Sequence, residues 1–282
     1  MSYHRPADLG EALSVLSEGA QCIAAGCTDL YPATPAKALP GPVLDITAIE
    51  ALRGIARTAE GWRLGATTTW TDILDSSLPP AFDSLKFAAR EIGSVQIQNA
   101  GTVAGNLCTA SPAADSVPCL LTLDAEVELQ SAAGIRTLPL AKFITRPRQT
   151  ARRPDELITA VLVPETAAQG TSHFLKLGAR KYLIISIVMS AARLVIEDGC
   201  ITEAALAIGA CSPVATRLPE QEAALIGHQL SNAAHRVDEA LVAPRLSPID
   251  DIRADTAFRR HAATELLRRT LAELSTPAEA AA

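Results

Sequence analysis

The chain carries the stretch Gly101-Thr102-Val103-Ala104-Gly105-Asn106, followed after a short gap by Ser111-Pro112-Ala113-Ala114-Asp115. These segments offer two glycines, two hydroxyl groups, an amide and a carboxylate, with no bulky side chain before Leu107. N–H and O–H groups donate to phosphate oxygens, and a carboxylate accepts from sugar hydroxyls. The stretch therefore predicts a cradle for a sugar diphosphate. A polar Ω-type loop held together by Asn and Asp turns is the alternative.

A second glycine loop follows an apolar segment near the N-terminus and reads Ile23-Ala24-Ala25-Gly26-Cys27-Thr28-Asp29-Leu30. Successive N–H groups in such a turn form an anion nest, and Gly26 lacks the Cβ that would keep a pyrophosphate away. The segment is not the G-x-G-x-x-G fingerprint, and taken alone it is equally compatible with a plain strand-to-loop turn. Two such loops in one domain suit a diphosphate better than one does.

Around these loops the apolar pattern predicts a mixture of helices and strands. We expect helices over residues 6–19, 82–92, 220–226, 231–241 and 254–274, and strands over residues 22–25, 43–46, 62–66, 125–129, 135–138, 157–163, 183–196 and 201–209. Residues 94–118 show neither period, so we expect a long loop there, and such loops are usually functional. Residues 165–171 form the expected domain boundary.

The composition excludes several classes of protein. With 48% hydrophobic and 20% charged residues, the 282-residue chain has an ordinary globular composition, and its net charge of -6 argues against a nucleic-acid partner. No apolar stretch reaches the roughly 18 residues of a membrane helix. Residues 1–10 lack the apolar core of a secretory signal, so we expect a cytoplasmic location.

The reactive side chains form no recognisable catalytic or metal-binding motif. The six cysteines contain no C-x-x-C pair, so we expect mostly buried, reduced thiols and no zinc or iron–sulfur site. The five histidines group with no Ser, Asp or Cys, and no serine has the G-x-S-x-G context of a hydrolase. The sequence thus offers a cofactor cradle without acid–base groups, which is typical of an electron carrier.

At both glycine loops the sequence resembles the FAD-binding subunits and domains of the xanthine dehydrogenase and carbon monoxide dehydrogenase family of molybdenum hydroxylases. Residues 25–30 are similar to the family's A-G-G-T-D-L, and residues 101–106 with 111–115 to its G-T-I-G-G-N and S-P-A-A-D. The similarity extends through residues 118–121. It continues at residues 174–180, which resemble the family's lysine-bearing strand, and from Pro248 to Arg269, so that it covers nearly the whole chain.

The resemblance implies an α+β fold. An FAD-binding domain of the p-cresol-methylhydroxylase type would span residues 1–168, as two subdomains of about 1–55 and 56–168. A smaller C-terminal domain, an antiparallel sheet plus helices, would span residues 169–282. No disulfide, metal ligand or catalytic residue is expected in this chain.

The implied function is that of an oxidoreductase subunit, the medium chain of a heterotrimer, that binds FAD non-covalently. Partner chains would supply the rest: a molybdopterin-binding large subunit and an iron–sulfur small subunit with two-iron clusters. This chain would relay electrons from those clusters to NAD+, a quinone or oxygen. Two other functions fit the same residues, a non-catalytic nucleotide-binding assembly module and a self-contained flavin oxidase.

The resemblance also assigns residues by position. Residues 23–30 and 102–106 would hold the diphosphate and Asp115 a hydroxyl of the cofactor, while Ile92, Ile158 and Lys176 would lie near the flavin. The full set of expected cofactor-binding residues is Ile23, Ala24, Ala25, Gly26, Cys27, Thr28, Asp29, Leu30, Ile92, Gly101, Thr102, Val103, Ala104, Gly105, Asn106, Ser111, Asp115, Ile158 and Lys176. For Ile92 and Ile158, core packing alone is the alternative.

The chain departs from the family pattern at three places. Cys27 and Ala104 each replace a glycine, and each would cost roughly 1 kcal/mol wherever the backbone requires a positive φ. Leu-Ile-Ile-Ser at residues 183–186 stands where the family has Asp-Ile-Ala, which changes the contacts expected near the flavin ring.

Overall fold

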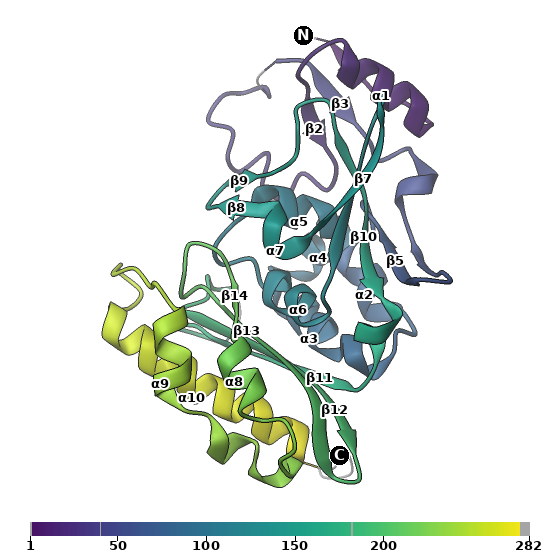
Figure 1. Cartoon of the computed structure of the whole chain (residues 1–282). Helices are drawn as coiled ribbons and strands as arrows, with labels where there is room; N and C mark the ends of the chain where they lie inside the picture. The colour runs from purple at the N-terminus through teal and green to yellow at the C-terminus, as the bar shows by residue number, and fades with distance from the viewer. Residues whose placement is uncertain (1, 40, 182, 277–282) are drawn as a thin grey trace. The chain divides into compact units, whose positions relative to one another are not determined.

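The computed structural model describes residues 2–39, 41–181 and 183–276 and contains two compact units (Figure 1). The first unit comprises residues 1–76, 94–110 and 125–164, and the second comprises residues 77–93, 111–124 and 165–282. The chain therefore passes repeatedly from one unit to the other, and the segment of residues 101–115 is divided between them after Ala110.

The N-terminal part of the first unit is a three-stranded parallel sheet with one helix against it. The strands β1 (Tyr3–His4), β3 (Val43–Asp45) and β2 (Cys22–Ala24) lie in that order, and α1 (Leu9–Ser17) packs on them. The shared core contains Ala12, Leu13, Leu16, Leu44, Ile46, Ile49, Leu52 and Leu157. The helix expected over residues 6–19 is confirmed but begins later, because the Asp8 carboxylate accepts from the Glu11 N–H at 2.9 Å and caps it.

The rest of the first unit is built on a five-stranded antiparallel sheet. Its order is β4 (Ile55–Arg57), β5 (Gly61–Gly65), β10 (Leu157–Pro164), β6 (Glu126–Ser131) and β7 (Gly134–Pro139). The same unit also contains the helices α2 (Trp70–Asp75), α4 (Val95–Ala100), α5 (Val103–Thr109) and α7 (Leu140–Phe143). A small hairpin of β8 (Ile144–Arg146) and β9 (Gln149–Thr150) completes it. The four strands expected in this region, over residues 62–66, 125–129, 135–138 and 157–163, are confirmed.

The long loop expected over residues 94–118 is wrong. The segment contains α4 and α5 and the start of α6 (Ser116–Thr122). These helices have six or seven residues each, which is too short for an apolar period to show, and most of their side chains are small or polar. Thr102 is the N-cap of α5 and accepts from the Gly105 N–H at 3.1 Å, so the glycine motif begins a helix instead of forming a loop.

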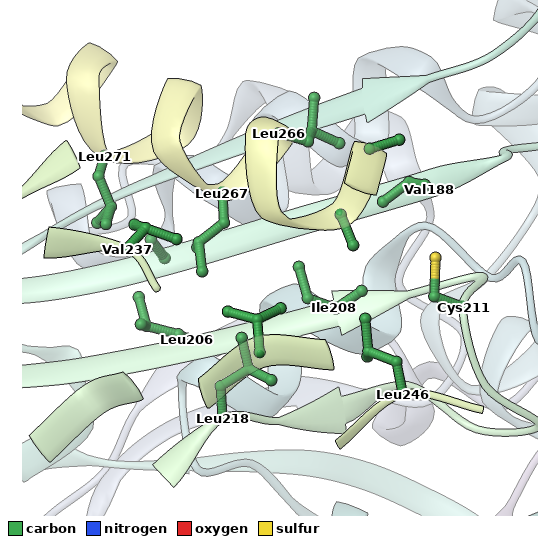
Figure 2. Packing of buried hydrophobic residues seen from close by; sticks show 14 of the residues in the cluster. Val188, Leu206, Ile208, Cys211, Leu218, Val237, Leu246, Leu266, Leu267 and Leu271 are labelled. Carbon is green, nitrogen blue, oxygen red and sulfur yellow. The ribbon is translucent and has the colours of Figure 1, made fainter. Parts of the chain in front are cut away.

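The second unit is a four-stranded antiparallel sheet in the order β11 (Thr171–Leu177), β12 (Val188–Glu197), β13 (Cys200–Gly209) and β14 (Thr216–Arg217). The long helix α10 (Thr256–Ser275) packs on one face with α8 (Pro219–Ala223) and α9 (Glu239–Val242). Figure 2 shows Leu267 and Leu271 of α10 directed at the strand residues Leu206 and Ile208. The helices α3 (Asp83–Glu91) and α6 also pack on the sheet, and the Arg193 guanidinium on β12 donates to the Thr122 carbonyl of α6 at 2.9 Å.

Two expectations for the second unit are wrong in detail. No single helix spans residues 231–241: two 3₁₀ turns precede α9, because the Asp238 carboxylate caps a new helix by accepting from the Ala240 N–H at 2.8 Å. The strand expected from residue 183 begins at Val188. The final helix is confirmed, and its Phe258 is half exposed.

Candidate functional site

The two glycine loops lie against each other in the first unit. A Cβ atom on residue 26 would stand 1.9 Å from the Ala100 carbonyl oxygen and 2.9 Å from the Cα of Gly101. No side chain fits in that space, because real Cβ contacts essentially never fall below 3 Å. At the other end of α5, the Thr109 hydroxyl donates to the Asp29 carboxylate at 3.3 Å. The structure therefore brings together the two segments that the sequence singled out separately.

The first loop presents backbone donors. Cys27 has φ 58°, in the left-handed region, which turns the chain sharply after Gly26. In the part of the chain that the structure describes, the N–H groups of Gly26, Cys27 and Thr28 donate to no protein acceptor. Successive N–H groups around a left-handed residue form a concave anion site. A pocket of about 490 Å³ lies beside them, lined by Ala24, Cys27 and Tyr31 among others, so a group attached to a bound phosphate has room.

The N–H groups of the second motif are already used by the protein. Val103 N–H donates to the Thr68 carbonyl at 2.9 Å and Ala104 N–H to the Ala66 carbonyl at 3.2 Å. The Gly105 N–H donates to the cap Thr102. Side chains of this motif, and not its backbone, are therefore the candidates for contact with a ligand, and the backbone donors come from the first loop.

The two residues that replace a family glycine differ in backbone conformation. Cys27 occupies the left-handed region, where a non-glycine residue costs roughly 1 kcal/mol or somewhat more. Ala104 lies in the first turn of α5 with helical geometry, so its Cβ carries no such cost. Only the first substitution strains the backbone.

A buried ion pair marks the second unit. The Lys176 ammonium on β11 lies 2.8 Å from the Asp115 carboxylate, and both side chains are less than a tenth exposed. The Ser186 hydroxyl donates to the other oxygen of Asp115 at 2.8 Å, and the ammonium also donates to the Glu91 carbonyl at 3.4 Å. Burial raises the pKa of Asp115, while the charge of Lys176 and the two hydrogen bonds oppose that rise.

Ser186 is the residue in this cluster that the sequence did not reveal. It lies in the apolar run just before β12, where nothing in the sequence distinguishes it from a core serine. The pairing of β11 with β12 brings the segment before β12 next to Lys176. The one available signal was the departure from the family's Asp-Ile-Ala at residues 183–186.

The remaining candidates lie at defined places in each unit. Ile92 is the C-cap residue of α3 in the second unit, next to Glu91, and is half-buried. Ile158 is buried in β10 in the first unit. The Ser111 hydroxyl accepts from the Ala113 N–H at 3.2 Å in the turn that leads into α6.

Over residues 2–39, 41–181 and 183–276, no group of three or more His, Cys, Asp or Glu side chains could hold a metal ion. None of the helices described is both long and apolar enough to cross a bilayer.

Two family profiles match most of the chain. One, described as the FAD binding domain in molybdopterin dehydrogenase, matches residues 1–166. The chain belongs to this family of FAD-binding proteins. The other profile, the CO dehydrogenase flavoprotein C-terminal domain, matches residues 173–274. The resemblance seen in the glycine motifs is confirmed, and FAD is the cofactor of this family.

Individual relatives span the same length. The xanthine dehydrogenase FAD-binding subunit of Escherichia coli O157:H7 is 30% identical over 278 residues, covering 96% of this chain and 95% of its own. The carbon monoxide dehydrogenase medium chain of Hydrogenophaga pseudoflava is 26% identical, covering 95% of each. A solved structure of reconstituted CO dehydrogenase from Oligotropha carboxidovorans has a TM-score of 0.90 at 25% identity, covering 98% of this chain and 97% of that one.

These comparisons confirm the expected fold class and the class of enzyme. The chain is an FAD-binding domain followed by a domain of antiparallel sheet and helices, as the family members are. Its relatives are dehydrogenase subunits, so the chain is an oxidoreductase subunit.

Replacing Gly26 with Ala tests the contact between the two loops. The added Cβ would collide with the Ala100 carbonyl, and relief requires movement of backbone, so we expect a loss of about 1–3 kcal/mol in the free energy of unfolding. Urea denaturation of the full chain measures it. Gly10→Ala in α1 is the control, expected to be neutral or stabilising because its Cβ meets only the Asp8 carboxylate at 3.3 Å. Equal stability of the two variants would refute the close contact.

Replacing Lys176 with Met tests the buried pair. Removing one partner of a buried ion pair costs about 3–5 kcal/mol. Without the ammonium, the pKa of Asp115 in the folded variant rises further above its value in the unfolded chain. The folded variant therefore keeps a proton on this carboxyl group at pH values at which the unfolded chain has lost it. Its deficit relative to the natural chain should therefore grow as the pH rises above the pKa that this carboxyl group has in the unfolded chain.

The control for this experiment is the double variant Lys176→Met/Asp115→Asn, which has no carboxyl group to titrate at this site. In urea unfolding, the difference in stability between this double variant and the natural chain should therefore vary much less with pH. If the slope persisted, another group would be responsible and the assignment to Asp115 would be wrong.

Proposed function

We propose that this chain is the FAD-carrying electron-transfer subunit of a multi-subunit molybdenum hydroxylase or dehydrogenase. It would relay electrons from iron–sulfur clusters in a partner chain to an external acceptor. The first loop is the observation that supports this proposal most directly. It combines the left-handed Cys27 with three adjacent N–H groups, and the contact of Gly26 with the backbone of Ala100 holds them in place. The names of the relatives, which include medium chains of dehydrogenases, support the assignment to a multi-subunit complex.

The residues of the first unit fit the diphosphate of FAD. Gly26, Cys27 and Thr28 would donate their N–H groups to phosphate oxygens, because no protein acceptor described in the structure competes for them. Thr102 and Asn106 would add side-chain contacts from α5. The pocket beside the first loop accommodates what is attached to the phosphates. We therefore assign residues 23–30 and 101–106 to this part of the cofactor, with Ile158 as a neighbour.

The residues of the second unit fit a polar part of the cofactor and its ring. Lys176 and Ser186 fix both oxygens of Asp115, so this carboxylate is oriented before any ligand arrives. A fixed acceptor suits a ribityl or ribose hydroxyl, which donates. Lys176 places a positive charge at the same point, and Ile92, near Glu91, adds an apolar surface.

Bound FAD supplies the redox couple, and the protein contributes binding, orientation and charge. Asp115 is the one buried carboxylate at the site, and the ammonium beside it holds its charge. Among the described residues, no group of three or more His, Cys, Asp or Glu side chains could hold a metal ion. This chain therefore positions a relay cofactor, and we propose that substrate is oxidised in a partner chain.

Purification of the tagged full chain from its natural host tests the relay function. We expect it to co-purify with a large molybdenum-containing chain and a small iron–sulfur chain, whereas the chain separated from them retains FAD and neither metal. Metal analysis and flavin release measure both. A chain that purified alone and oxidised a substrate would be a self-contained flavin oxidase, and one that never held FAD would be an assembly module.

Variants of the two motifs test the site assignment. Asn106→Ala removes the side-chain amide, and Asp115→Asn replaces the charged acceptor with a neutral amide. Both groups are proposed to contact the cofactor, so FAD affinity should fall about fivefold or more. Asn232→Ala, at an exposed 3₁₀ turn of the second unit, is the control and should bind FAD as the natural chain does. Unchanged FAD affinity in both site variants would remove these residues from the site.

A further inference from the structure

One buried guanidinium group, that of Arg259 near the start of α10, joins three segments of the second unit. The Arg259 side chain is completely buried, and it lies 2.8 Å from the Asp251 carboxylate. It also donates to the Ile187 carbonyl at 2.6 Å and to the Ala210 carbonyl at 3.1 Å. A buried charge is costly unless it is paired and hydrogen-bonded, so these contacts hold the three segments together.

The first of these segments carries Ser186, whose hydroxyl donates to the Asp115 carboxylate at 2.8 Å. The carbonyl of Ser186 itself accepts from the Arg253 guanidinium at 3.0 Å. The next carbonyl along the chain, that of Ile187, is the one held by the buried guanidinium. Two consecutive carbonyl groups are therefore fixed by two arginines, and the backbone that carries the Ser186 hydroxyl has little freedom to move.

The second segment contacts the stretch that carries Asp115. Ala210 has φ 62°, in the left-handed region, and its N–H donates to the Pro112 carbonyl at 3.1 Å. Pro112 stands three residues before Asp115 in the turn that leads into α6. A non-glycine residue keeps such a conformation only where its surroundings impose it, and here Arg259 holds the Ala210 carbonyl. The carboxylate and the hydroxyl that donates to it thus depend on the same guanidinium.

The third segment supplies one carboxylate that orients both arginines. Asp251 accepts from the Arg253 guanidinium at 2.6 and 3.1 Å, and its other oxygen accepts from Arg259. The hydrogen bonds from Arg253 lower the pKa of Asp251, although burial opposes that change, so this carboxyl group stays ionised. The Arg253 side chain is 28% exposed, so its replacement disturbs the core less than replacement of Arg259 does.

We propose that Arg253 and Arg259 are positioning residues for the cofactor: through Ser186 and the Ala210 turn, they fix the Asp115 carboxylate for the FAD hydroxyl that it is proposed to bind. This inference rests on the proposed function, which assigns Asp115 to the cofactor. An acceptor that is oriented beforehand loses less freedom on binding. Loosening the Ser186 segment should therefore weaken FAD binding without the removal of a direct contact.

A double-mutant cycle on FAD affinity tests this connection. The full chain is freed of flavin, and FAD is titrated into the natural chain, Arg253→Gln, Ser186→Ala and the variant with both changes. We expect each single change to weaken binding about fivefold or more. The second change should add little to the first, because Arg253 acts through Ser186. Arg260→Gln, at an exposed site on α10, is the control and should bind as the natural chain does.

The outcomes separate this inference from the proposed function. A natural chain that takes up no FAD contradicts the proposed function. Bound FAD with unchanged affinity in Arg253→Gln, with losses that add in full, or with an equal loss in Arg260→Gln, overturns the positioning role alone. Arg259→Gln should show the same loss as Arg253→Gln. Thermal unfolding shows whether each variant is folded, and the cycle at Arg253 decides if Arg259→Gln is not.

Discussion

The close approach of two backbones at Gly26 is the constraint on which the first unit depends. Because the loop after β2 touches the end of α4, Gly26 has no room for a side chain, and Cys27 must turn the chain in a left-handed conformation. That turn exposes consecutive N–H groups. The glycine is thus required by the protein's own packing, in addition to any ligand, and the anion site is a consequence of how the two loops fit together.

In the second unit, the corresponding constraint is the buried carboxylate of Asp115. Asp115 is removed from water, which raises its pKa, and it is held by the Lys176 ammonium and the Ser186 hydroxyl. Such a pair contributes little to stability compared with apolar packing, because desolvation offsets most of the attraction. Its value lies in fixing the orientation of the carboxylate. A cofactor that must stay in one position requires contacts that are fixed in this way.

Much of this could be predicted from the sequence, and the exceptions have physical reasons. Long elements were predicted correctly. In α10 the buried residues recur at helical spacing, and the β12–β13 hairpin consists of two long, largely buried runs. The short helices α4 and α5 were missed because six or seven residues are too few to show a helical period. The glycine motifs were recognised by their composition. Their contact could not be predicted, because it joins residues that are far apart in the sequence. Ser186 was missed because only strand pairing brings it to Asp115.

We propose that the glycine loops and the Asp115–Lys176 pair hold FAD in a chain that acts as an electron carrier. The most direct measurement is the visible spectrum of the purified full chain, followed by quantification of the flavin released on denaturation. We expect a yellow protein that releases stoichiometric FAD, free of any covalent link, and that holds less FAD when Asn106 is replaced with Ala. A colourless chain that takes up no added FAD would contradict it.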